Sequence, residues 1–236
     1  GQSALLVAVV TGASVALAVP LAWLTARTDL PFRRLWSVLT ALPLVVPSYV
    51  GAFQAVSALG PKGLMQQLLA PLGVDRLPEI YGLPGAAITL TLLSYPYILL
   101  TVRAGLRNMD PSLDESARLL GHGPWSAALR LTLPQLRPSI AAGSLLVALY
   151  TLSDFGAVSI MRYETFTWAI YQQYQSSFDR GIAAVLSLVL VLLAAVILMS
   201  GGFARARGRY SRPGAGSPRP LSVVRLGRWR WPAVGL

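Results

Sequence analysis

The sequence predicts an all-α protein, a polytopic membrane bundle of about five transmembrane helices. Of its 236 residues, 54% are hydrophobic and only 12% are charged, whereas soluble domains carry about 25% charged residues. The charged residues lie between long apolar windows, and most of the basic ones lie on one side of the expected bundle. We therefore expect a membrane-embedded fold in which the loops dock other molecules.

Five apolar windows are long enough to cross a bilayer. They cover residues 3–24, 35–59, 83–102, 138–160 and 181–203. About 20 helical residues, rising about 1.5 Å each, span the ~30 Å hydrocarbon core of a membrane. Only the window at 138–160 contains a charged residue, Asp154. Residues 1–203 are therefore expected to form one transmembrane domain.

The net charge of +11 is explained by topology. Of the 20 Lys and Arg residues, 16 lie between the first two windows, in residues 103–137 or in the C-terminal tail. Because basic residues concentrate on the cytoplasmic side, these segments are expected inside the cell and the N-terminus outside. Nucleic-acid binding is not expected. The chain has no Cys and one His, which excludes a disulfide or a multi-histidine metal centre within it.

The C-terminal tail differs in character from the spans. Residues 204–230 combine eight arginines with Pro and Gly, which predicts a flexible cytoplasmic linker held loosely by anionic membrane lipids. Residues 231–236 are typical of the start of a further span. The sequence therefore suggests a piece of a longer polytopic protein, with at least one span missing upstream.

Candidate pathway residues lie in two of the windows. Pro43 and Pro47 are expected to break the span at 35–59, either as packing kinks or as kinks that shape a pathway. Asp154 lies about 15 residues, or roughly 22 Å, into the fourth span. Acids inside membranes are costly and usually face a cavity or a partner. Asp154 is thus either a pathway or gate residue or a local hydrogen-bond acceptor near a helix end, with Tyr49 and Tyr163 as candidate neighbours.

Residues 103–137 form the loop that carries the most specific pattern. Asp110-Pro111 is typical of a helix start, and Gly121 is typical of a helix end. A second short helix is expected over 125–131, before Leu133-Pro134. The loop therefore predicts two short cytoplasmic helices joined by a glycine-rich elbow.

This pattern resembles the EAA loop of ABC-transporter permease subunits. The resemblance is carried by Glu115-Ser116-Ala117, by Gly121 four residues later, by the aliphatic Leu131 and by Leu133-Pro134. Serine replaces the middle alanine of the family, and leucine replaces the usual isoleucine. The resemblance implies that the loop forms coupling helices that sit in a cleft of a cytoplasmic ATPase. Trp125 is a candidate anchor of that contact.

Two further segments resemble iron(III)-type permeases, which are commonly two fused halves. They are residues 42–49, with the sequence LPLVVPSY, and residues 152–158, with the sequence LSDFGAV. This resemblance implies ferric iron as substrate and this chain as a first permease half, with the second half fused or separate. Permeases for thiamine, polyamines, sulfate and phosphonate share a similar architecture and remain alternatives.

The expected partners follow from the family resemblance and from a missing motif. The sequence has no Gly-x-x-x-x-Gly-Lys-Ser/Thr phosphate loop, so the chain is not expected to be an enzyme or to hold a cofactor. ATP and Mg would be used by a separate ATPase dimer. A periplasmic or lipoprotein solute-binding protein would deliver substrate at the bacterial inner membrane. An ATP-independent secondary transporter is the less favoured alternative.

Changing Gly121 to a bulky residue is expected to abolish transport while leaving membrane insertion intact, because a glycine permits close backbone approach at the coupling contact. Uptake and membrane-fraction immunoblots of the same cells measure the two effects. Normal uptake by such a variant would refute the coupling role.

Overall fold

The computed structural model describes residues 1–61, 63–70, 79–109, 126, 130, 132–176 and 180–207. Every regular element in this part of the chain is a helix. In chain order these are α1 (Gln2–Arg27), α2 (Arg33–Leu39), η1 (Leu42–Val45), α3 (Ser48–Leu59), α4 (Leu64–Leu69), α5 (Leu83–Arg107), α8 (Leu133–Gln135), α9 (Arg137–Ser153), α10 (Gly156–Ile160), α11 (Phe166–Ser176) and α12 (Gly181–Arg207). The predicted all-α helix bundle is confirmed.

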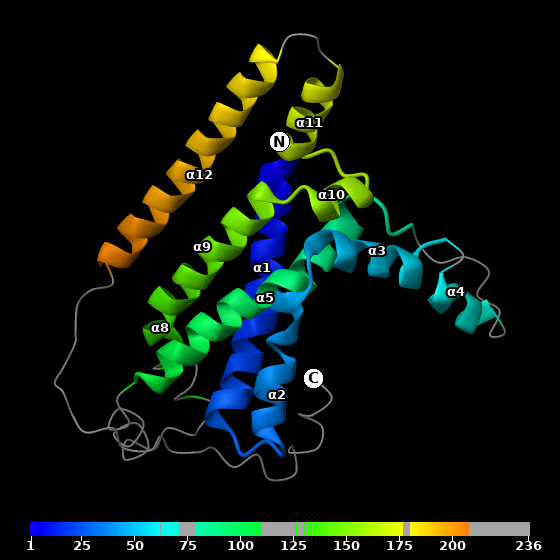
Figure 1. Cartoon of the computed structure of the whole chain (residues 1–236). Helices are drawn as coiled ribbons and strands as arrows, with labels where there is room; N and C mark the ends of the chain where they lie inside the picture. Colours follow the sequence, from blue (N-terminus) through cyan, green and yellow to red (C-terminus); the bar gives the residue numbers. More distant parts are fainter. Residues whose placement is uncertain are drawn as a thin grey trace.

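Three helices form the centre of the bundle. Helix α5 packs against both α1 and α9, and α1 also contacts α9 (Figure 1). In the most apolar part of α5, 67% of the residues are buried, against 6% in α12. The core side chains are aliphatic, among them Leu6, Leu90 and Ile98, each fully buried. Helix α5 is therefore the helix around which the others assemble.

Small residues allow the central helices to approach closely. A methyl group on Gly143 of α9 would lie 2.6 Å from the Cα atom of Ile98 in α5. Gly105 of α5 is similarly close to Ser139 of α9. Between α1 and α5, the hydroxyl oxygens of Ser14 and Ser94 lie 3.5 Å apart in a buried contact. Membrane helices associate through such small residues because van der Waals contact replaces the hydrophobic effect within lipid.

The span expected over 35–59, with a break at its prolines, is interrupted in the structure. The segment formed by α2 and η1 and the segment formed by α3 and α4 meet at a bend of 101° (Figure 1). Pro43 lies within η1, and Pro47 precedes the first residue of α3. Each Pro lacks an amide hydrogen and disfavours helical backbone at the residue before it, so two prolines four residues apart favour a break in this segment. The break is larger than a kink, and the pair forms either one broken span or a re-entrant segment.

The fourth expected span, over 138–160, is also not one helix. Helix α9 ends at Ser153, Asp154 is extended with φ −68° and ψ 133°, and α10 begins at Gly156. The expectation of one continuous helix over 138–160 was therefore wrong, and Asp154 lies directly after the end of α9. Within the described residues, α1, α5 and residues Gly181–Gly201 of α12 are long and apolar enough to span a membrane, and the bent pair would make a fourth such segment.

Helix α12 lies at the edge of the bundle, where it packs against α9 and α11 (Figure 1). Its outward side chains are large and apolar, including Val185, Leu188 and Val196, which are 61%, 60% and 63% exposed. Such a surface is stable in contact with lipid or another membrane helix. Of the three candidate spans in the described residues, the most apolar one is thus the one least covered by the rest of the chain.

Gly143→Val is expected to destabilise the bundle, because the new side chain would overlap the α5 backbone at Ile98. Overpacking of this kind costs about 1–3 kcal/mol. The thermal unfolding midpoint of the protein purified in detergent measures the effect. Gly12→Val is the matched control, because a methyl group there meets no atom within 4 Å. Equal midpoints for the two variants would contradict the close packing of α5 and α9.

Candidate functional site

Asp154 lies at the break between α9 and α10, where its carboxylate receives hydrogen bonds from backbone groups. Its Oδ1 atom accepts the N–H of Ala157 at 2.9 Å and that of Val158 at 3.4 Å. The side chain is only 8% exposed. These bonds satisfy amides at the start of α10 that lack helical partners, as a capping residue does.

The same carboxylate connects this break to the break in the other interrupted segment. Ser48, the first residue of α3, hydrogen-bonds with Asp154, and it also pairs with the hydroxyl of Tyr150 in α9. Gly156 makes the approach possible, since a methyl group there would lie 2.8 Å from Ser48 Oγ and 3.0 Å from Tyr49 Cβ. The start of α3 and the start of α10 therefore meet at one buried acid.

A fourth helix joins the junction through the backbone of Asp154. The hydroxyl of Thr167, in the first turn of α11, donates to the carbonyl oxygen of Asp154 at 2.8 Å. Thr167 Oγ1 also lies 2.9 Å from Thr165 Oγ1. Asp154 thus fixes α3, α9, α10 and α11 relative to one another, and we call this contact the Asp154 junction. Of the two roles considered for Asp154, this geometry supports the local hydrogen-bond role.

Only some of the other candidate pathway residues lie at this junction. Pro47 directly precedes Ser48, and Tyr49 follows it with 58% of its side chain exposed. Pro43 lies in η1, on the other limb of the bend. Tyr163 instead reaches α1, where its hydroxyl donates to the carbonyl oxygen of Gln2 at 3.2 Å. The structure brings Pro47 and Tyr49 to Asp154 and places Tyr163 against the N-terminal end of α1.

Most of the predicted coupling residues, namely Glu115, Ser116, Ala117, Gly121, Trp125 and Leu131, lie outside the described residues. Leu133 and Pro134 are described and form the first two residues of α8. They line a groove of about 500 Å³ with Val15, Val19 and Pro20 of α1. The end of the loop therefore lies beside the proline of α1.

Two arginines connect the helices near the start of the same loop. Arg27, the last residue of α1, is 4% exposed, and its Nη2 lies 3.7 Å from Sδ of Met109 just beyond α5. Arg103 of α5 donates from Nη1 to the carbonyl oxygen of Ser37 in α2 at 3.1 Å. Residues 103–137 therefore begin at a point where α1, α2 and α5 are held together.

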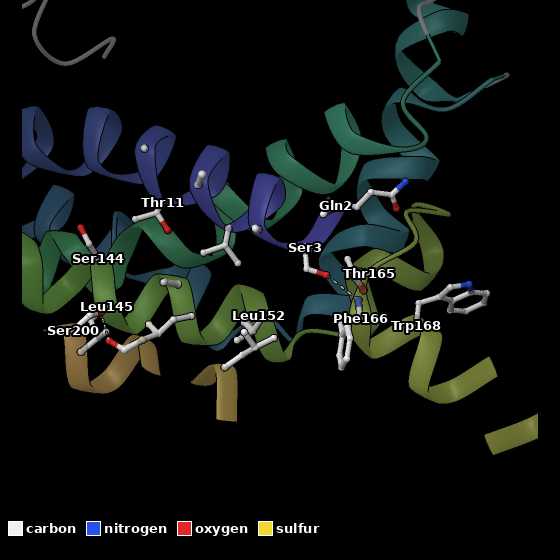
Figure 2. A pocket seen from close by; sticks show the side chains of 18 of the residues that line it. Gln2, Ser3, Thr11, Ser144, Leu145, Leu152, Thr165, Phe166, Trp168 and Ser200 are labelled. Carbon is white, nitrogen blue, oxygen red and sulfur yellow. Dashed lines mark hydrogen bonds between the residues drawn. The ribbon is translucent and has the colours of Figure 1, made fainter. Parts of the chain in front are cut away.

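An open groove of about 1210 Å³ lies between α1, α9, α11 and α12 (Figure 2). Its walls are mainly apolar and small, and they include Ala8, Gly12 and Ala148. Polar groups gather at the end near the N-terminus, where Ser3 Oγ accepts the N–H of Phe166 at 2.8 Å (Figure 2). The hydroxyls of Thr11, Ser144 and Ser200 lie further along it.

Neither groove nor junction offers a metal centre in the described part of the chain, which holds no group of three or more His, Asp or Glu side chains close enough to share an ion. Sequence reasoning missed Ser48, Gly156 and Thr167 as members of the Asp154 junction. A usable signal was present, because Pro47-Ser48 and Asp154-Phe155-Gly156 are both typical of a helix start that follows a break.

Comparisons with known proteins agree with this architecture. Residues 14–207 match the family model described as "Binding-protein-dependent transport system inner membrane component". The chain is 34% identical to the Fe(3+)-transport system permease protein FbpB 2 of Haemophilus influenzae over 94% of its own length, and it spans only 40% of that relative. It is 31% identical to the molybdenum transport system permease protein ModB of Mycobacterium tuberculosis, with 85% of this chain and 78% of the relative covered.

Solved structures show the same fold at lower identity. The MetNI methionine ABC transporter in an inward-facing conformation matches with a TM-score of 0.66 at 16% identity, covering 87% of this chain and 92% of that one. A bacterial ABC transporter that imports alginate matches with a TM-score of 0.65 at 19% identity, covering 89% and 79%. Together with the family match over most of its length, these findings show that the chain belongs to the binding-protein-dependent transport system inner membrane components, the permeases of ABC importers.

Proposed function

We propose that this chain is a membrane-spanning permease subunit of an ATP-driven importer and forms half of its translocation pathway. The observation that carries the proposal is the family match over residues 14–207, combined with relatives that are transport permeases for Fe(3+), molybdenum and sulfate. The broken segments add support, because non-helical backbone within a membrane is tolerated only where protein or a water-lined cavity covers it.

In this proposal the energy comes from a separate ATPase dimer that docks on residues 103–137. Closure of the dimer on ATP and Mg would displace the helices around Gly121, and the displacement would reach the bundle through the two ends of the loop. One end lies at Arg27 and Met109, and the other lies at Leu133 and Pro134 beside α1. Both ends contact α1, so α1 and α5 are expected to move together.

Ferric iron is the substrate we propose, because the similarity to the Haemophilus influenzae Fe(3+) permease covers nearly the whole chain. Relatives named for molybdenum and sulfate transport are 27% to 31% identical, so an oxyanion is the alternative substrate class. A solute-binding protein outside the membrane would deliver the substrate. A second permease half, fused or separate, would complete the pathway in the bacterial inner membrane, with the loop and tail in the cytoplasm.

Uptake of labelled ferric iron, molybdate and sulfate by cells with and without the full-length gene tests the proposal. We expect gene-dependent uptake of ferric iron, supported only when the partner ATPase can hydrolyse ATP. Gene-dependent uptake of molybdate or sulfate instead would correct the substrate and leave the importer assignment in place. Full-rate uptake in reconstituted vesicles that lack the ATPase would overturn the assignment.

Asp154→Asn and Asp154→Ala distinguish a structural role of this acid from a role of its charge. Asparagine keeps an oxygen that accepts the Ala157 and Val158 amides, so near-normal stability and uptake are expected. Alanine removes this cap, which costs about 0.5–2 kcal/mol, and the thermal unfolding midpoint in detergent should fall. If the Asn variant is stable but takes up no substrate, the carboxylate charge acts directly in the pathway.

A further inference from the structure

Helix α11 presents two different faces to two different grooves. One face, at the spacing of Thr165, Ala169 and Gln172, lines the groove of Figure 2. The other face, at the spacing of Thr167, Tyr171 and Tyr174, lines a second groove of about 610 Å³ against α12. Positions separated by four and three residues share one side of a helix, so the two grooves are separate surfaces. The proposed function assigns no role to the residues of the second groove.

The second groove has a single charged group at one end and an apolar wall below it. Among its described lining residues the formally charged one is Arg180, which directly precedes α12. Its guanidinium lies over the ring of Tyr174, 5.0 Å from the ring centre. A cation held this way stacks on the aromatic face and keeps its N–H edges free to donate to a phosphate.

The apolar wall has the length of one leaflet. It follows α12 through Ala183, Ala184 and Leu190. Ser187 also lines it, and its hydroxyl donates to the carbonyl oxygen of Ala183 at 2.9 Å within the helix. From Arg180 to Leu190 the helix rises roughly 15 Å, which is half of the ~30 Å hydrocarbon core. Because α12 is a candidate span that begins at Gly181, we expect Arg180 at the membrane surface and Leu190 near the midplane.

Aromatic side chains line the side of the groove away from α12, among them Phe155, Tyr171 and Tyr174. The ring of Phe155 lies 4.9 Å from that of Tyr171, and it also lies 6.0 Å from that of Trp168, which lines the groove of Figure 2. Tyr171 and Tyr174 are 42% and 49% exposed. Tyr and Trp favour the headgroup depth of a bilayer because their rings are apolar and carry a polar edge. The cluster continues directly from the Asp154 junction, since Phe155 follows that residue.

We propose that this groove holds one anionic phospholipid, with its phosphate against Arg180 and one acyl chain along α12. A phospholipid has one negative group at one end and hydrocarbon along the rest, which matches the order of charge and apolar wall in the groove. The substrate ions proposed above have no hydrocarbon part, so they do not account for the wall below Arg180. Bound there, the lipid would occupy the groove between α11 and α12, at the edge of the contact that these two helices make with each other.

Lipid retention by the purified, fully assembled transporter tests the proposal. Wild-type protein equilibrated with phosphatidylglycerol, then washed in detergent, is expected to retain about one such lipid per chain at this site by native mass spectrometry. Arg180→Gln should weaken retention about five-fold, the effect of roughly 1 kcal/mol per basic residue at a membrane surface. Ala184→Phe, which places a ring in the groove, should weaken retention with the arginine intact.

Arg162→Gln is the matched control, because Arg162 also lies over a tyrosine ring, 4.9 Å from the centre of Tyr81, and does not line the groove. Equal loss of lipid in the two arginine variants would overturn the proposal. A wild-type complex that retains no lipid would also overturn the proposal, since the groove would then hold no lipid in the assembled transporter. Displacement by inorganic phosphate alone, with Ala184→Phe unaffected, would show an anion site without an acyl chain. None of these measurements requires ATP or substrate, so the lipid site and the importer function fail independently.

Discussion

Two membrane segments break within apolar sequence, and the structure depends on how those breaks are satisfied. An unpaired backbone amide in lipid costs several kcal/mol, so a helix can stop there only if another group takes its place. The carboxylate of Asp154 accepts the amides at the start of α10 and bonds to Ser48 at the start of α3. One buried acid therefore caps the helix after one break and connects it to the helix after the other, so the bend at Pro47 is positioned by a residue more than 100 positions away.

The arrangement of helices around this junction follows the burial of each helix. Helix α5 can carry polar and small residues, such as Ser94 and Gly105, because other helices cover it and approach closely. Helix α12 is covered little and is apolar on its outward side, as contact with lipid requires. This contrast separates a central unit of α1, α5 and α9 from a peripheral helix. The groove of Figure 2 lies between the central helices α1 and α9 and the helices α11 and α12, and the second groove lies between α11 and α12.

The sequence predicted where most helices lie and some residues of the candidate site, but not the size of the break or every contact of Asp154. The apolar windows located the helices because hydrocarbon thickness sets the length of a span, and Pro43 and Pro47 signalled a break. The size of that break, 101°, could not be read from the sequence, since one proline can give either a kink or a complete turn. Residues 138–160 were expected to form one helix, whereas α9 ends at Ser153, directly before Asp154. A window of hydrophobicity does not show where the helix hydrogen bonds stop. Tyr163 was expected near Asp154, whereas its hydroxyl contacts α1.

The sequence by itself determined the class of protein, the approximate helix limits and the loop pattern of the family. These properties depend on composition, on apolar stretches of about 20 residues and on short motifs, all of which are local along the chain. Only the tertiary structure decided that Ser48, Tyr150, Asp154 and Thr167 meet, and that α11 separates two grooves. These are contacts between distant segments, and they depend on how closely small residues such as Gly143 and Gly156 let the helices approach. No local pattern specifies that distance, because it is set by the packing of all the helices together.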